Sequence, residues 1–283
     1  MPVCVRHTDR PTGLACTRCG RPACPECLRP ASVGQHCVDC VRADQRSMPK
    51  VREVSGAVAA RKATPFVTYA LIALNVVVYA VTSVQARSLM GNEVESALFV
   101  DWVMFPPAVA GGEWFRVIGS GFLHYGLIHL LLNMLALYIV GRDIEIVLGR
   151  ARYLAVYLIS LLGGSAAVML LAQENLTAGA SGAVYGLFGA ITVILVRLRQ
   201  NPNSMLILIG INVFISFSLP GISLWGHLGG LAAGTLATLG VLFLPEWVRA
   251  RSPQQARLVG VIALGVVAVA ALVVIGVAAA SLR

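Results

Sequence analysis

Seven apolar segments constrain the fold of this chain more than any other feature of its sequence. Most of them approach the ~20 residues that a helix needs to cross the hydrocarbon core of a bilayer. They occupy residues 65–84, 124–142, 151–172, 181–198, 204–219, 223–243 and 258–279. Because lipid offers no hydrogen-bond partners, such segments must satisfy their backbone groups internally as helices. The sequence therefore predicts an all-α polytopic membrane protein, in agreement with its 57% hydrophobic and 12% charged residues.

The basic residues predict how these segments are oriented. Residues 1–62 contain 11 of the 22 Lys and Arg but no apolar run that could serve as a secretory signal. With the N-terminus in the cytoplasm, cytoplasmic loops receive eight of the remaining arginines and outer loops receive three. This asymmetry satisfies the positive-inside rule. We therefore expect a multi-pass protein of the plasma membrane, and the frequent Ala, Val, Gly and Arg favour a bacterial inner membrane.

A basic linker is expected at residues 42–64, directly before the first span. Its basic residues are Arg42, Arg46, Lys50, Arg52, Arg61 and Lys62. We interpret this linker as a cytoplasmic anchor that contacts anionic lipid of the bilayer. That interpretation is favoured over nucleic-acid binding, and no nucleic-acid partner is expected.

All seven cysteines lie in the first 40 residues, in a regular pattern of pairs. The pairs are Cys4-x2-His7, Cys16-x2-Cys19, Cys24-x2-Cys27 and Cys37-x2-Cys40. Thiolate and imidazole are the usual ligands of zinc, and four protein ligands make a closed, structural site. The pattern therefore predicts a zinc-binding module at residues 1–41 with two structural Zn2+ ions. The alternative, disulfides or free thiols, is less favoured because seven cysteines cannot all pair and the cytoplasm is reducing.

The pairing of these ligands stays open at the level of sequence. If the first and third pairs share one ion and the second and fourth share the other, the module resembles the cross-braced B-box type. His36 is an alternative to Cys37 as a ligand. We expect the module to regulate access or to recruit a cytosolic protein partner.

The predicted spans contain no Asp or Glu, so the few polar residues in them are conspicuous. An ionisable side chain in lipid is costly unless it faces a cavity or a partner, so each is a functional hypothesis. The polar residues that stand out are His124, His129, Asn133, Ser181, Tyr185 and His227. Span order and a helix rise of ~1.5 Å per residue place them at one depth, near the outer face. We interpret Asn75 and Asn212 instead as interhelical hydrogen-bonding residues.

Glycines on two of the spans predict close helix packing. Gly182 and Gly186 recur at an interval of four, as do Gly226, Gly230 and Gly234. Such faces let two backbones approach closely, which would allow a short serine side chain to reach an imidazole. The same glycines are also typical of helix packing without any catalytic role.

Three motifs in these segments resemble those of the rhomboid intramembrane serine proteases. They are Gly179-Ala180-Ser181-Gly182, His227-Leu228-Gly229-Gly230 with Gly234, and His124-x4-His129-x3-Asn133. Further similar marks are Gly112-Glu113-Trp114-Phe115-Arg116 and the stretch from Glu145 to Gly149. The resemblance covers residues 65–243 and implies a rhomboid-like six-helix catalytic core. Residues 244–283 would then add a loop and a seventh transmembrane helix.

The resemblance implies an intramembrane serine endopeptidase that uses a Ser-His dyad and an acyl-enzyme, without a cofactor for catalysis. In it, Ser181 is the nucleophile and His227 the general base. The predicted spans agree, because none offers a carboxylate for a triad. The implied oxyanion donors are His129, Asn133 and the Ser181 backbone N–H, and the implied pocket and support residues are His124, Tyr185, Gly179, Gly182, Gly230 and Gly234. The implied substrates are single-span membrane proteins, cleaved near the outer face.

The alternative from another class is a non-catalytic rhomboid-like protein that binds transmembrane clients. Such a protein would be expected to lack Ser181 or His227, and both are present. Aspartyl and zinc intramembrane proteases are disfavoured, because the spans hold neither paired Asp nor a His-Glu-x-x-His motif. A transporter is disfavoured by the lack of a charged path through the spans.

Overall fold

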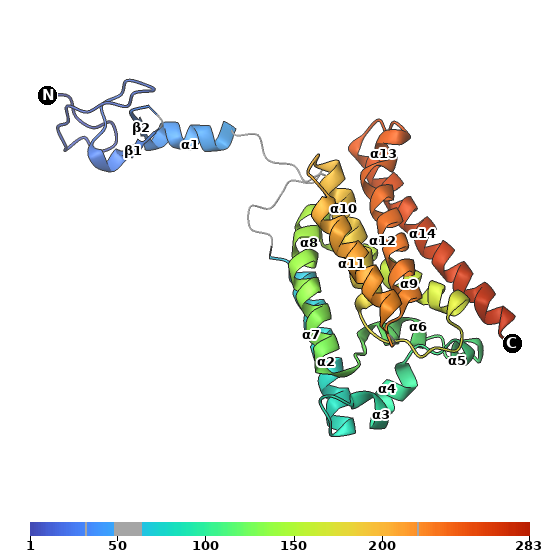
Figure 1. Ribbon diagram of the computed structural model, residues 1–283. Coiled ribbons are helices and arrows are strands. Elements are labelled where there is room, and N and C mark those ends of the chain that lie inside the picture. Colours follow the sequence, from blue (N-terminus) through green and yellow to red (C-terminus); the bar gives the residue numbers. More distant parts are fainter. Residues whose placement is uncertain (32, 48–63, 220) are drawn as a thin grey trace. The chain divides into compact units, whose positions relative to one another are not determined.

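The computed structural model describes residues 1–31, 33–47, 64–219 and 221–283. The chain forms two compact units, Met1–Val51 and Arg52–Arg283. The first is a small cysteine-rich unit and the second a bundle of helices (Figure 1). Of the basic linker expected at residues 42–64, residues 42–47 belong to a helix. Residues 48–63 lie outside the described part of the chain.

The N-terminal unit has little regular secondary structure. A 3-10 turn η1 (Pro25–Cys27) leads into β1 (Leu28–Pro30), which pairs antiparallel with β2 (Gln35–Cys37) and is followed by α1 (Val38–Ser47). Its core consists of cysteines together with Ala23 and Leu28. So small an apolar core does not stabilise a unit of this size without cross-links or metal.

The seven predicted apolar segments are all helical, which confirms the all-α fold. The helices are α2 (Phe66–Ala86), α7 (Gly126–Ala136) with its continuation, α9 (Arg150–Leu171), α10 (Ser181–Arg197), α11 (Asn203–Ser218), α12 (Leu224–Leu242) and α14 (Pro253–Ser281). Helix α7 continues through the π-helical turn η3 (Leu137–Gly141) into α8 (Arg142–Leu148).

This continuation carries the second helix beyond residue 142, where its span was predicted to end, and it includes an acid, Glu145, whose carboxylate is bound by another helix. The Glu145 carboxylate is buried. It accepts hydrogen bonds from the Val67 and Thr68 N–H groups, at 3.0 and 2.8 Å, at the start of α2. An acid at this position therefore caps a helix N-terminus that would otherwise carry unpaired donors.

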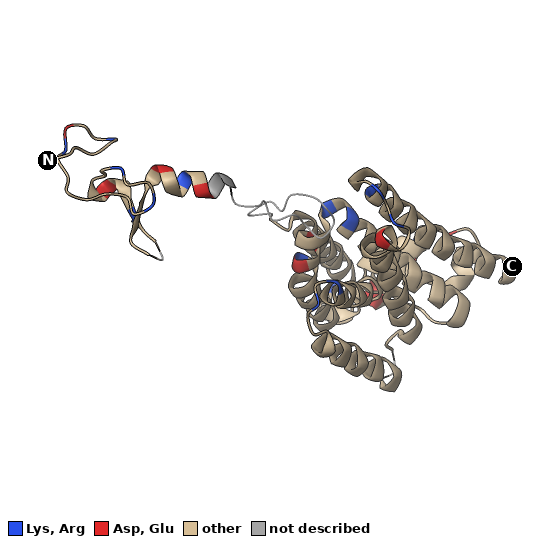
Figure 2. Cartoon of the chain, turned by 90° about the horizontal axis from the view of Figure 1, so that it is seen from above, with Lys and Arg blue, Asp and Glu red and all other residues tan. Residues whose placement is uncertain are grey.

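Length and composition identify part of the bundle as membrane-spanning. Among the described residues, α2, α9 and α14 can each cross a bilayer, and the pair Arg116–Phe122 and Gly126–Leu148, bent by 92°, would make a fourth span. Helices α10 and α11 are apolar but have only 17 and 16 residues. Helix α12 has 19 residues, including His227 and several glycines, which lower its hydropathy. Figure 2 shows few charged residues along the bundle helices, as expected of a multi-pass membrane protein.

Three helices, α9, α10 and α12, pack against one another, and α14 packs against α9 and α12 (Figure 1). Glycine makes the closest of these contacts possible. A Cβ atom on Gly230 would lie 1.9 Å from the Gly182 carbonyl oxygen, and one on Gly234 would lie 2.4 Å from that of Gly186. The backbones of α10 and α12 thus touch directly, as small-residue faces allow.

The segment between α2 and α7 consists of short helices. They are α3 (Asn92–Glu95), α4 (Ala97–Trp102), α5 (Pro106–Ala110), α6 (Arg116–Gly119) and the 3-10 turn η2 (Ser120–Phe122). Another short helix, α13 (Leu244–Trp247), precedes α14. Arg116 ties this segment together by donating to the carbonyls of Val100 and Val103 at 2.8 and 2.9 Å. Met104 and Thr177 exchange two backbone hydrogen bonds of 3.0 Å, which fix the segment to the loop before α10.

Candidate active site

The side chains of Ser181 and His227 meet where α10 and α12 begin. Ser181 is the first residue of α10, and His227 lies in the first turn of α12. The Ser181 Oγ and the His227 Nε2 are 2.8 Å apart, within hydrogen-bond distance. His227 is 7% exposed, and Ser181 is partly exposed. The glycine contact between the two helices brings a short hydroxyl within reach of a buried imidazole.

Two further side chains contact the His227 ring, one on its face and one at its Nδ1 atom. The Tyr185 ring is stacked on it, with centroids 4.0 Å apart and planes inclined by 11°. The Ser216 Oγ lies 2.7 Å from His227 Nδ1 and 3.0 Å from the Tyr185 hydroxyl. The sequence does not point to Ser216, because a serine in an apolar helix is usually a packing residue. Its only sequence signal is a position near the end of α11, shortly before His227.

His129 approaches the same place from α7. A Cβ atom on Gly179 would lie 2.7 Å from His129 Cε1, 3.0 Å from His129 Nε2 and 3.5 Å from Ser181 Oγ. The imidazole therefore lies against Gly179, beside Ser181. Gly179 also has a φ of +132°, a conformation that residues with a side chain rarely adopt. The lack of space for a side chain and the positive φ both favour glycine two residues before Ser181.

The other two residues of the His124-His129-Asn133 motif make no hydrogen bond to Ser181 among the described residues. The Asn133 amide donates to the His129 carbonyl at 3.0 Å, within its own helix. His124 precedes α7, is fully buried and lies edge-on to the His129 ring at 5.1 Å. Neither ring nitrogen of His124 has a hydrogen-bond partner among the described residues.

Asn92, which the sequence did not point to, positions the start of α7. It is fully buried. Its side chain accepts from the Gly126 N–H at 2.9 Å and donates to the His124 carbonyl at 3.0 Å. Asn92 also donates to the Thr82 hydroxyl at 2.9 Å, so it links α2 to the segment that leads to His129.

A small pocket adjoins Ser181. The bundle and the loops contribute small residues to its lining, among them Ser120, Gly121, Thr177, Ser223 and Gly226. Met104, Leu161 and Val168 also line it, so little space remains and the pocket suits a small side chain rather than an aromatic one.

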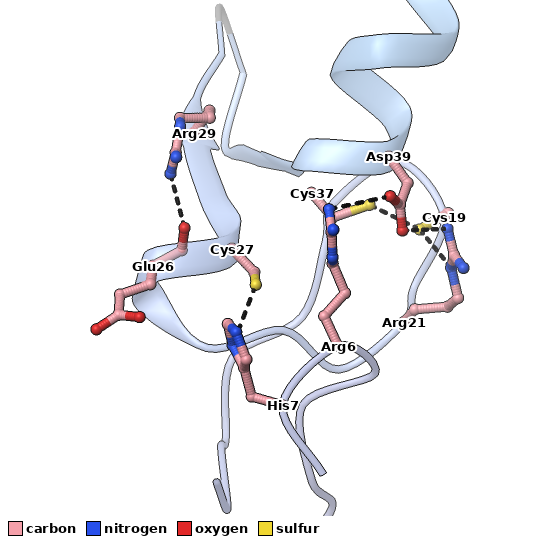
Figure 3. A network of polar contacts seen from close by, with 9 residues as sticks. All are labelled: Arg6, His7, Cys19, Arg21, Glu26, Cys27, Arg29, Cys37 and Asp39. Atoms are coloured by element: carbon pink, nitrogen blue, oxygen red, sulfur yellow. Dashed lines mark hydrogen bonds and ion pairs between the residues drawn. The ribbon is translucent and has the colours of Figure 1, made fainter.

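A second group of candidate residues lies in the N-terminal unit, where the structure forms two four-ligand clusters. Cys4, His7, Cys24 and Cys27 form one, and Cys16, Cys19, Cys37 and Cys40 form the other. The first cysteine pair thus joins the third, and the second joins the fourth. His36 is outside both clusters, paired with Arg29 in the β-ladder. Figure 3 shows the His7 ring directed at Cys27, and Arg21 and Asp39 beside Cys19 and Cys37.

The spacing of the donor atoms fits tetrahedral zinc. With Zn–S bonds of ~2.3 Å, two thiolates on one ion lie about 3.8 Å apart. The Cys19 and Cys37 sulfurs are 3.8 Å apart, and those of Cys16 and Cys40 are 3.9 Å apart. The His7 Nδ1 lies 3.3 Å from the Cys24 sulfur. No disulfide joins any of the seven cysteines, all of which the structure describes.

The surroundings of the thiols also favour a cation. Backbone N–H groups, that of Cys24 above all, lower the pKa of the Cys4 thiol from 9.0 to about 6. Burial and the neighbouring thiols raise the pKa of Cys27 to about 11, because adjacent thiolates repel one another. Arg21 donates to the Cys19 sulfur at 3.5 Å and lowers the pKa of that thiol. Two Cys/His clusters of this kind can hold metal ions.

Comparison with known proteins places the helical unit in a family. Residues 111–244 match the Rhomboid domain. The chain is 34% identical over 179 residues to the "Putative rhomboid protease YdcA" of Bacillus subtilis, an overlap that covers 61% of this chain and 86% of that protein. The chain therefore belongs to the rhomboid family, whose members are multi-pass membrane proteins.

Two longer relatives match over part of their length. "Rhomboid protease GluP" of Bacillus subtilis is 32% identical over 187 residues, which is 64% of this chain and 36% of GluP. "RHOMBOID-like protein 4" of Arabidopsis thaliana is 33% identical over 157 residues, which is 53% of this chain and 40% of that protein. The chain thus spans well under half the length of these two relatives.

Proposed function

We propose that this protein is an intramembrane serine endopeptidase, with Ser181 as nucleophile and His227 as general base. The observation that carries the proposal is the 2.8 Å contact between Ser181 Oγ and His227 Nε2 in a rhomboid-family bundle. In this proposal residues 65–243 form the catalytic core, and residues 244–283 add a loop and a further helix. Relatives named as rhomboid proteases support the same class of activity.

The proposed chemistry balances with these two side chains and water. His227 Nε2 accepts the Ser181 proton as Oγ attacks the substrate carbonyl carbon. The protonated ring then donates to the leaving amine, and the acyl-enzyme ester remains on Ser181. A water molecule, deprotonated by Nε2, attacks the ester and releases the second product as a carboxylic acid, which restores Ser181. No carboxylate is needed in the dyad.

The developing oxyanion needs donors close to Ser181. Ser181 begins α10, where backbone N–H groups have no intrahelical partner. His129 supplies a second donor: the Tyr125 N–H donates to His129 Nδ1 at 3.3 Å, so the ring proton of a neutral His129 resides on Nε2. Removing one such donor typically costs 10²–10³ in kcat. Asn133 is retained as a proposed third donor, one helical turn from His129.

The proposed substrates are single-span membrane proteins, cut near the outer face of a bacterial inner membrane. Extended backbone is required at Ser181, so small or helix-breaking residues at the cleavage site are expected to be favoured. The small pocket beside Ser181 supports the same preference. The N-terminal unit would be cytoplasmic and hold two structural Zn2+ ions, with a regulatory or recruiting role.

Labelling by a serine-reactive fluorophosphonate probe tests the dyad in the purified full chain in detergent. We expect labelling of the wild type and its loss in both Ser181→Ala and His227→Ala. Ser218→Ala, which changes an exposed serine of α11, is the matched control and should label as the wild type does. If the wild type remains unlabelled while a related active protease labels, the dyad is inactive and a non-catalytic, client-binding rhomboid becomes the better assignment.

A further inference from the structure

Helix α11 contributes one contact to the site that the dyad alone does not explain. Ser216 is the one buried residue of this helix, whose other residues are half-buried or exposed, and 4% of its surface is accessible. Its hydroxyl has three neighbours at hydrogen-bond distance: His227 Nδ1 at 2.7 Å, the Asn212 carbonyl oxygen at 2.7 Å and the Tyr185 hydroxyl at 3.0 Å. These three contacts use the full capacity of one hydroxyl, which is one donated and two accepted hydrogen bonds.

The direction of each bond follows from the partners. The Asn212 carbonyl oxygen has no proton to give, so Ser216 must donate its only proton there. The two lone pairs of Ser216 Oγ then accept from the other neighbours. Tyr185 donates its O–H, and His227 donates from Nδ1.

The protonation of one ring nitrogen determines the role of the other. In a neutral imidazole with a proton on Nδ1, Nε2 carries a lone pair and accepts hydrogen bonds. His227 Nε2 faces Ser181 Oγ at 2.8 Å, so the lone pair is directed at the proton of the proposed nucleophile. The opposite tautomer would present an N–H to Ser181 and could not act as a base.

We propose that Ser216 is a positioning residue that holds His227 in the Nδ1–H tautomer, with Nε2 free to accept the Ser181 proton. Ser216 acts through His227 and does not touch the reacting atoms. It occupies the place that the acid has in a Ser-His-Asp triad, but as a neutral acceptor. When His227 becomes protonated during the reaction, the same hydroxyl accepts from the imidazolium. This inference rests on the proposed function for its kinetic consequence, but not for the tautomer.

Tyr185 and Asn212 complete the arrangement. The Tyr185 ring covers one face of His227, and its hydroxyl occupies the second lone pair of Ser216. The Asn212 side chain, expected to bond between helices, donates instead to the Leu208 carbonyl of its own helix at 2.9 Å. The part of Asn212 that matters here is its main-chain carbonyl, which orients the Ser216 hydroxyl. Serines that bond to the preceding turn are common in membrane helices, so the test must separate positioning from packing.

Four variants of the full chain separate the two roles. Ser216→Ala removes the acceptor, and Ser216→Cys nearly keeps the side-chain size but offers a poor acceptor. Ser216→Thr restores a hydroxyl, and Ser218→Ala changes an exposed serine two residues away on the same helix. Thermal unfolding in detergent identifies any variant that is not folded, and Ser216→Cys keeps the test informative if Ser216→Ala unfolds.

The first readout is the tautomer itself, measured by NMR of protein labelled with 15N and 13C in histidine. The ring 15N and 13Cδ2 resonances of His227 are assigned by their loss in His227→Asn. We expect the Nδ1–H form in the wild type, in Ser216→Thr and in Ser218→Ala. We expect the Nε2–H form to become populated in Ser216→Ala and Ser216→Cys.

The second readout is the rate of fluorophosphonate labelling. We expect Ser216→Ala and Ser216→Cys to lower this rate by about 10- to 100-fold, the range for one lost hydrogen bond to a group that becomes charged. Ser216→Thr should recover most of the rate, and Ser218→Ala should not change it. An unchanged His227 tautomer in folded Ser216→Ala, with an unchanged rate, would overturn the inference while leaving the dyad intact.

The two readouts also separate this inference from the proposed function. A wild type that fails to label, but whose His227 tautomer changes in Ser216→Ala, supports the positioning role and contradicts the protease activity. A wild type that labels at the same rate as Ser216→Cys, with the same tautomer, supports the activity and contradicts the positioning role.

Discussion

At the scale of single residues, the two histidines nearest Ser181 have opposite tautomers, and each suits a different role. The Tyr125 N–H donates to His129 Nδ1, which leaves the proton on Nε2 as a donor. Ser216 accepts from His227 Nδ1, which leaves Nε2 as an acceptor. Each neighbour acts on the nitrogen away from Ser181, so the same side-chain type can serve as the proposed oxyanion donor and as the proposed base.

The two proposed oxyanion side chains, His129 and Asn133, should contribute unequally to kcat. His129→Ala should lower kcat for a purified single-span substrate by about 10²–10³, because it removes an N–H directed at the site. Asn133→Ala should cost less, because the Asn133 amide already donates to the His129 carbonyl. Steady-state kinetics in detergent checks both, with KM expected to change little. An Asn133→Ala defect as large as that of His129→Ala would assign the main oxyanion contact to Asn133 instead.

At the scale of helices, the site depends on a backbone contact between α10 and α12. Gly230 illustrates how little room there is, since a Cβ there would lie 1.9 Å from the carbonyl oxygen of Gly182. A carbonyl of a packed helix cannot move aside as the end of a flexible side chain can. The separation of the two helices sets the distance between Ser181 and His227, so this contact matters for stability and for the proposed chemistry.

A pair of glycine substitutions tests this dependence. Gly230→Ala should destabilise the protein by about 3 kcal/mol, the upper end of the usual range for overpacking, because the added methyl group must push two helices apart. Gly276→Ala in α14 is the matched control: nothing lies within 4 Å of a Cβ at that position. The control should be neutral or stabilising by up to about 1 kcal/mol, because alanine favours helix more than glycine does. Thermal unfolding in detergent measures both, and similar stabilities would show that the α10–α12 contact is not tight.

The helices themselves were predictable from hydropathy, because lipid leaves an apolar segment no alternative to internal backbone bonding. The continuation of the second helix to Leu148 was not, since a buried acid at 145 is understandable only when the start of α2, 77 residues away, is known to donate to it. The proposed site residues Ser181, His227, His129 and Tyr185 could be singled out from the sequence, because ionisable and strongly polar side chains are rare in spans, and the structure brings them together. Ser216 and Asn92 were not, because their roles depend on partners from other helices that one sequence does not identify.

At the scale of the whole molecule, two units with different sources of stability share one chain. The helical unit is stabilised by packing, whereas the N-terminal unit has a core made mainly of cysteines. The sequence indicated eight candidate ligands but left their pairing open, because pairing is a property of the folded loops. The structure groups Cys4 with Cys27 and Cys16 with Cys40. Two zinc ions would therefore cross-brace loops that are far apart in sequence.

Zinc analysis of the purified full chain tests this arrangement. We expect two Zn2+ per chain, and loss of one or both in Cys37→Ser, because a site with three ligands binds zinc less tightly. His36→Ala is the matched control and should retain two ions, because His36 lies outside both clusters. If His36→Ala loses zinc while Cys37→Ser keeps it, the neighbouring histidine is the ligand.

Removing the metal from the same samples tests whether the activity of the helical unit depends on the folding of the N-terminal unit. Because the binding free energy of structural zinc is folding free energy, a chelator should unfold the N-terminal unit, seen as increased amide hydrogen exchange in residues 1–40. The residues that form the proposed dyad and its support all come from the helical unit, so fluorophosphonate labelling of Ser181 should persist at nearly the same rate. Zinc-free protein that no longer labels, although its helical unit remains folded, would show that catalysis requires the zinc-bound form. In that case the N-terminal unit would be a regulator of the reaction itself rather than of substrate recruitment.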